Sequence, residues 1–165
     1  MNKIKLLLIV VFAGSFTFSS CKKESGCTDK NANNFDVDAE TNSGCVYRYA
    51  SSIEVSGVSS TNPNGESWDI DGSYPDLKVN FGKSSNSGYD FTTDTQVDTL
   101  AASLTPNSNI QFTNQEWKYE LVDDDLLSAS EIIASGTFNP VTQGGSKVIT
   151  ITNGTITVKF NFTLN

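Results

Sequence analysis

The sequence has 165 residues, with 11 Lys and Arg against 19 Asp and Glu, which gives a net charge of −8, and it contains no histidine. The acidic balance argues against a nucleic-acid partner, because the phosphate backbone is also negative. The absence of histidine excludes Ser-His-Asp and Cys-His catalysis and removes the commonest metal ligand. Abundant Gly, Ser, Thr and Asn are typical of a turn-rich extracellular β domain, and the length suits one domain with small appendages.

The N-terminus has the pattern of an export signal. Lys3 and Lys5 precede an apolar run over residues 6–13, which small residues follow. This run is shorter than the roughly 20 apolar residues of a transmembrane helix. We therefore expect residues 1–20 to be a signal peptide that is cleaved.

The signal peptide is followed directly by a cysteine. Residues 18–21, Phe-Ser-Ser-Cys, resemble a bacterial lipoprotein box, with Phe18 in place of the usual Leu. The resemblance implies that Cys21 is lipidated, that residues 21–26 form a tether, and that a lipid anchor holds the protein at the membrane. We expect a location in the bacterial cell envelope, at the outer membrane or cell surface, with ordinary secretion as the alternative.

The other two cysteines are Cys27 and Cys45, which are separated by 17 residues. A pair of cysteines in an exported chain is expected to oxidise. Closing a loop of this length stabilises the folded chain by about 3 kcal/mol. Because the segment between them is poor in apolar residues, much of its order must come from the disulfide.

The segment around this pair has a recognisable pattern. Its characteristic positions are Gly26, Cys27, Thr28, Asp29, Ala32, Asn34, Phe35, Asp36, Ala39, Cys45 and Tyr47. The pattern resembles a short disulfide repeat of bacterial surface and secreted proteins, with Phe35 where that repeat has Tyr and Ser43-Gly44 where it has Gly-Ser. The resemblance transfers no activity to this chain and implies that residues 27–47 form a spacer or display module. Its acidic residues are interpreted as a solvated loop.

From residue 53 onward, apolar and polar residues alternate as in half-buried β-strands. The alternating segments are 53–58, 77–81, 117–121 and 156–164, and residues 147–151 also have strand character. Asn153-Gly154 predicts a two-residue hairpin turn, and Thr95–Leu104 is the one helix candidate. We expect a linker over 48–52 and then an antiparallel β-sandwich over 53–165.

Carboxylates gather in two loops that adjoin the predicted strands. Asp69, Asp71 and Asp76 precede the strand 77–81, while Asp123 to Asp125 and Glu131 follow the strand that starts at Trp117. Two acidic loops can meet at one end of a sandwich. Clustered carboxylates together with backbone carbonyls supply the six to eight oxygens that Ca²⁺ requires.

The two loops resemble those of a C2 domain. Residues 68–81 look like its first calcium loop and the following strand, and residues 121–133 look like the loop with its paired aspartates. The resemblance implies an all-β, C2-like sandwich and a Ca²⁺ ligand set. That set is Asp69 or Asp71, Asp76, Asp123, Asp125 and Glu131. The sequence departs from the C2 pattern at three places: Pro75-Asp76 inverts the usual Asp-Pro, Glu131 replaces Asp and Ala134 replaces Gly. These departures concern the number of bound Ca²⁺ ions and their affinity more than the fold.

These features predict a non-enzymatic, lipid-anchored surface protein that uses Ca²⁺ to order its loops and binds an unknown anionic molecule, glycan or protein. An alternative is a carbohydrate-binding module with at most a structural calcium. For that module Trp68, Trp117 and Tyr119 are the aromatic candidates, the last two being expected in the core. A third interpretation is a glycosidase with Asp76 and Asp123 as its acid pair, which would need one carboxyl in an apolar pocket.

Overall fold

The computed structural model describes residues 23–125, 129–141 and 147–165; the predicted signal peptide and Cys21 lie outside these ranges. The described residues form strands and turns but no helix, so these ranges contain no helix able to cross a membrane. The strands are β1 Ser25–Gly26, β2 Thr41–Asn42, β3 Arg48–Ser56, β4 Leu77–Lys83, β5 Phe91–Thr92, β6 Ala102–Leu104, β7 Gln111–Phe112, β8 Trp117–Asp123, β9 Glu131–Phe138, β10 Val148–Asn153 and β11 Ile156–Leu164.

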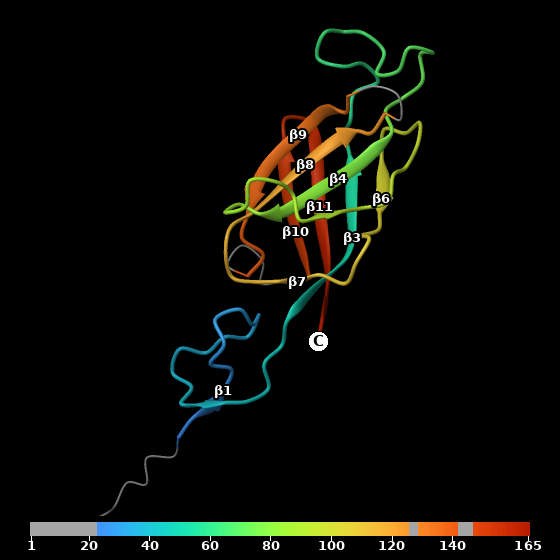
Figure 1. Ribbon diagram of the computed structural model, residues 1–165. Helices are drawn as coiled ribbons and strands as arrows, with labels where there is room; N and C mark the ends of the chain where they lie inside the picture. Colours follow the sequence, from blue (N-terminus) through green and yellow to red (C-terminus); the bar gives the residue numbers. More distant parts are fainter. Residues whose placement is uncertain (1–22, 126–128, 142–146) are drawn as a thin grey trace, which may run out of the picture.

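Two antiparallel sheets pack face to face as a sandwich (Figure 1). One sheet has the order β5-β4-β8-β9, and the other has the order β10-β11-β3-β6, with β7 also paired to β3. The predicted alternation is confirmed in β4, where Leu77, Val79 and Phe81 are fully buried, and in β8, where Trp117 and Tyr119 are buried. The predicted all-β, antiparallel C2-like sandwich is therefore confirmed.

Phe112 of the two-residue strand β7 lies at the centre of the aromatic core. Its ring centroid is 4.5 Å from that of Trp117, 5.2 Å from that of Phe162 and 5.9 Å from that of Phe138. Such edge-to-face arrangements stabilise beyond the burial of area alone. Since β7 is too short to show an alternating pattern, the sequence did not predict this core position.

Three local predictions differ from the structure. Residues 48–52, expected as a linker, are the first half of β3 and pair with β11 and β7. Thr95–Leu104 is not helical and ends in strand β6. The β10–β11 turn consists of Gly154 and Thr155, because Asn153 still pairs with Ile156 and Gly154 takes the positive φ of 61°.

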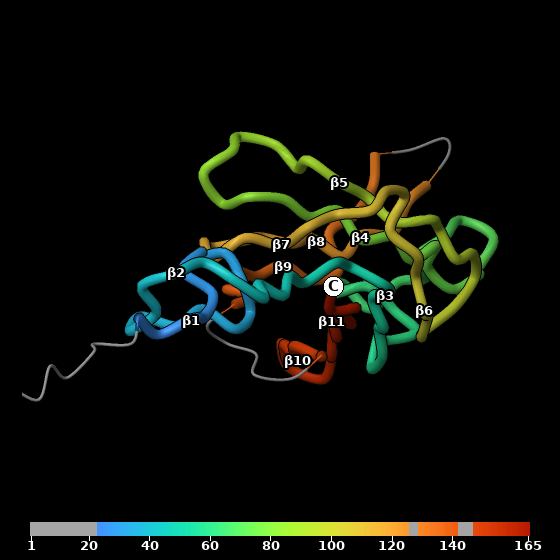
Figure 2. The backbone as a smooth tube through the Cα atoms, turned by 90° about the horizontal axis from the view of Figure 1, so that it is seen from below, coloured from blue at the N-terminus to red at the C-terminus, as the bar shows by residue number. Residues whose placement is uncertain are grey.

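The predicted disulfide between Cys27 and Cys45 is present, with a Cα–Cα distance of 4.8 Å. It closes a small module in which β1 and β2 pair in parallel. The module lies at the end of the sandwich where β3 begins, next to the C-terminal end of β11 (Figures 1 and 2).

Candidate metal centre

Three aspartates from two loops meet at the opposite end of the sandwich. One carboxylate oxygen each from Asp69, Asp123 and Asp125 lies within 4.8 Å of the others. The register explains this meeting, because β4 and β8 are antiparallel neighbours with Leu77 paired to Asp123. The loop that enters β4 therefore lies beside the residues that leave β8.

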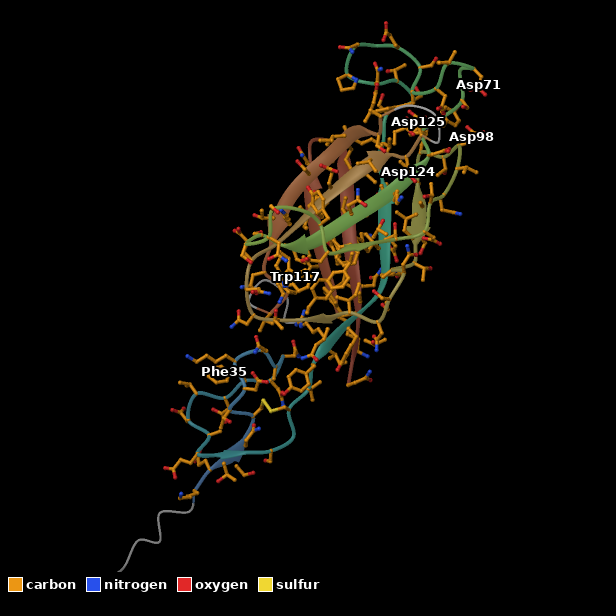
Figure 3. All side chains as sticks on the ribbon, in the orientation of Figure 1. Phe35, Asp71, Asp98, Trp117, Asp124 and Asp125 are labelled. Atoms are coloured by element: carbon orange, nitrogen blue, oxygen red, sulfur yellow. A yellow bond between two sulfur atoms is a disulfide. The ribbon has the colours of Figure 1, made fainter. Side chains whose placement is uncertain are left out.

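A tight turn brings Asp69 into place. Gly72 has a φ of 88°, a conformation that favours glycine, and its NH donates to the Asp69 carbonyl at 3.0 Å. The Ser73 hydroxyl lies 2.8 Å from Asp69 Oδ2 and 2.6 Å from Asp71 Oδ1. The turn thus holds the Asp69 carboxylate toward β8, whereas Asp71 stays exposed (Figure 3).

Asp123 is the buried member of the group, with an exposed fraction of 0%. Its Oδ1 accepts a hydrogen bond from the Asp76 NH at 2.7 Å. Its Oδ2 is buried and has no hydrogen-bond partner among the residues that the structure describes. An ionised oxygen in this state is costly unless it is neutralised.

The electrostatics of the site reflect this crowding. Burial raises the pKa of Asp123 to about 6; the Asp76 NH acts in the opposite direction, and the charges of Asp125, Asp69 and Asp76 add to the rise. For Asp69, the Ser73 hydroxyl lowers the pKa, but desolvation together with Asp125 and Asp76 outweighs it, so the net pKa is raised. The group therefore favours either protonation or a cation.

Asp76 lies next to the three aspartates and is fixed by a third loop. Its Oδ1 accepts a hydrogen bond from the Asp98 NH at 2.8 Å, and Asp98 Oδ1 accepts one from the Tyr74 NH at 2.8 Å. Asp98 has a positive φ of 50°, which is uncommon for a residue with a side chain. Sequence reasoning missed Asp98, because it lies between β5 and β6, outside the two acidic loops, and contacts Asp76 through its backbone NH.

Two further predicted ligands, Asp71 and Glu131, lie outside the group of three, as does their neighbour Asp124. Asp71 Oδ1 accepts hydrogen bonds from the NH and the hydroxyl of Ser73. Glu131 begins β9 as an exposed residue, opposite Asp123 in the ladder. Asp124 forms an ion pair with Lys78 at 3.0 Å and accepts a hydrogen bond from Thr95. Since side chains alternate along an extended chain, Asp123 and Asp125 face the site while Asp124 faces away from it.

The aromatic candidates for sugar binding are buried. Trp68 is 8% exposed and donates its Nε1–H to the Ser59 carbonyl at 2.9 Å. Trp117 and Tyr119 are in the core, as expected. Tyr74, in the loop before β4, is 45% exposed. These positions provide no row of exposed rings for a glycan.

Searches against protein-family models and curated proteins found no match. Among solved structures, three of human GIVD cytosolic phospholipase A2 are similar, with TM-scores of 0.52, 0.53 and 0.53 and identities of 18%, 17% and 16%. The first is a complex with methyl γ-linolenyl fluorophosphonate, and the third also contains terbium chloride. The matches cover 74% of this chain but only 17%, 16% and 18% of the phospholipase chains. The shared part is the C2-like sandwich, and at this identity the likeness shows the fold alone.

Proposed function

We propose that this chain is a non-enzymatic, lipid-anchored protein of the cell envelope whose C2-like sandwich binds Ca²⁺ at Asp69, Asp123 and Asp125. The observation that carries the proposal is the buried, unpartnered Oδ2 of Asp123 beside two further carboxylates. Without a cation, three carboxylates this close repel one another, and one of them is removed from water. A bound divalent ion removes both costs.

The donor set suits a hard cation. Carboxylate oxygens are the ligands that Ca²⁺ prefers, and its six to eight positions exceed what three aspartates supply. Asp76, fixed by the Asp98 NH, is the nearest additional acid. Coordination positions that the protein does not fill are available to water or to oxygens of an anionic surface ligand. This arrangement favours calcium-dependent binding over a purely structural ion.

The lipid anchor and the absence of catalysis complete the proposal. The anchor is inferred from Cys21 in its lipoprotein-box context. The chain lacks histidine, and its clustered carboxylates suit a cation better than the separated acid and base of a glycosidase. The buried positions of Trp68, Trp117 and Tyr119 give the carbohydrate alternative less support than the calcium site has.

Thermal unfolding with and without Ca²⁺ tests the proposed site. A ligand that binds only the folded state at 100 times its dissociation constant adds about 2.7 kcal/mol of stability. For a domain of this size the midpoint is expected to rise by several degrees. Asp123→Asn and Asp125→Asn should each abolish most of the rise, because Asn keeps the size of the side chain but removes the charge.

Two variants serve as controls for this experiment. Asp71→Asn changes an acid in the same loop but outside the group of three, and Asp94→Asn changes an exposed acid whose Oδ1 accepts a hydrogen bond from the Thr105 NH. Both should keep the full calcium response. The absence of any calcium-dependent rise in the wild type, or its equal loss in Asp71→Asn, would contradict the proposed site.

A further inference from the structure

The junction between the disulfide module and the sandwich contains a buried cation. Arg48, the first residue of β3, is 1% exposed. Its Nε donates to Asn33 Oδ1 at 2.7 Å, and its Nη2 donates to the same oxygen. Its guanidinium carbon lies 5.4 Å from the ring centroid of Phe162. Its Nη1 is buried without a hydrogen-bond partner among the described residues, so the two bonds to Asn33 offset only part of the cost of burying this charge.

Asn33 belongs to the module and is held rigidly within it. Its NH donates to the Val46 carbonyl at 2.7 Å. The neighbouring Asn34 accepts a hydrogen bond from the Val46 NH at 2.8 Å and donates to the Gly44 carbonyl at 2.8 Å. These bonds flank Cys45, where the disulfide closes the module. The acceptor that Arg48 meets is thus part of a cross-linked unit.

Two further sets of contacts join the module to the sandwich. Asn31 Oδ1 accepts a hydrogen bond from the Asn114 NH at 3.1 Å. Tyr47 and Asn165 exchange two backbone hydrogen bonds, at 2.6 and 3.0 Å. Three segments of the sandwich, far apart in the sequence, therefore hold one face of the module. A flexible spacer would leave these groups in water.

We propose that the disulfide module is a docked, rigid extension of the sandwich, locked by Arg48 on Asn33, and that this lock fixes the direction of the acidic end. Figure 3 shows the module, marked by Phe35, at one end of the molecule and Asp125 at the other. If Cys21 carries the anchor proposed above, the metal centre faces away from the bilayer that holds the chain. Its partner then lies on an opposing surface and not on that bilayer.

Distance measurements between spin labels test the lock in the full chain. Labels are placed on Val37→Cys, in an exposed position of the module, and Thr150→Cys, in an exposed position of β10, in a Cys21→Ser background. The wild-type junction should give one narrow distance distribution. Asn33→Ala removes the acceptor of Arg48 and should broaden the distribution, whereas Asn33→Asp keeps Oδ1 and should leave it narrow.

Asn161→Ala is the matched control, because this side chain bonds Ser52 and Glu54 on the sandwich, away from the module, and it should leave the distribution narrow. Mass mapping verifies that Cys27 and Cys45 stay paired in every variant. A broad wild-type distribution, an unchanged width in Asn33→Ala, or equal broadening in Asn33→Asp would overturn the lock. The measurement is made with and without Ca²⁺, so a failed calcium site leaves its result intact.

Discussion

Asp123 shows how one residue can link the fold to the site. Its position in the ladder, paired with Leu77, places it at the point where the sheet ends and the loops begin. Full burial makes its ionised form unfavourable, while the Asp76 NH satisfies only one of its two oxygens. Its ionised form therefore decreases the stability of the folded protein unless a proton or a cation neutralises it.

The raised pKa of Asp123 predicts a specific pH dependence. Between its unfolded pKa of 3.8 and its folded pKa of about 6, the folded state holds a proton that the unfolded state has lost. Stability without calcium should therefore fall as the pH rises through this window. Asp123→Asn should remove this loss and should be more stable than the wild type at pH 7.5 by up to about 3 kcal/mol. Chemical denaturation in a chelator at pH 4 and 7.5 measures the difference.

Asp90 provides a control, because its contribution to stability should depend on pH in the opposite direction to that of Asp123. The Lys83 NH and the Asn86 side chain lower its pKa, so its contribution to stability is present above the unfolded pKa and is lost on acidification. Asp90→Asn should thus be less stable than the wild type at pH 7.5. A variant of Asp123 that loses stability at pH 7.5 without calcium would show that its charge is not unfavourable.

At the scale of elements, long alternating segments were predictable and short ones were not. The pattern over 117–121 identified Trp117, Tyr119 and Leu121 as core, because five alternating residues suffice to show a period of two. The strand β3 was predicted to start at residue 53 instead of Arg48, since the buried Arg48 breaks the apolar pattern. The hydrogen-bond partner of Arg48, Asn33, lies in the disulfide module. The acidic loops were found from composition, but the choice of Asp69 over Asp71 depends on the turn at Gly72 and on the register of β4 with β8.

The short strand β7 carries a prediction of its own. Phe112→Ala would leave a cavity among Phe81, Trp117, Phe138, Phe160 and Phe162. Truncation of a fully buried Phe costs about 3 to 5 kcal/mol, so the unfolding midpoint in denaturant should fall accordingly. Phe35→Ala, at a position 38% exposed on the module, should change it little. Equal effects of both substitutions would mean that Phe112 does not hold the core together.

At the scale of the whole molecule, the disulfide module and the group of three aspartates lie at opposite ends of the sandwich. The disulfide module, marked by Phe35, lies at one end, and the aspartates gather at the far end of the sandwich (Figure 3). The buried cation Arg48 lies at the junction between the module and the sandwich, and the buried Asp123 lies at the opposite end. This arrangement suits the proposed protein, which would be attached to a membrane at the module end and would bind a ligand at the acidic end.

The last prediction is that a lipid anchor on Cys21 attaches the module end of the chain to the membrane. Metabolic labelling with a fatty acid should mark the wild type, and Cys21→Ser should lose both the label and retention in the membrane fraction, because the thiol is the acylation site that the lipoprotein box implies. The paired change Cys27→Ser and Cys45→Ser removes the other two cysteines and the disulfide, yet it should keep label and retention. A Cys21→Ser protein that is still labelled and still sediments with membranes would show that another residue or mechanism attaches the chain. The direction of the acidic end relative to the bilayer would then no longer follow from the docked module.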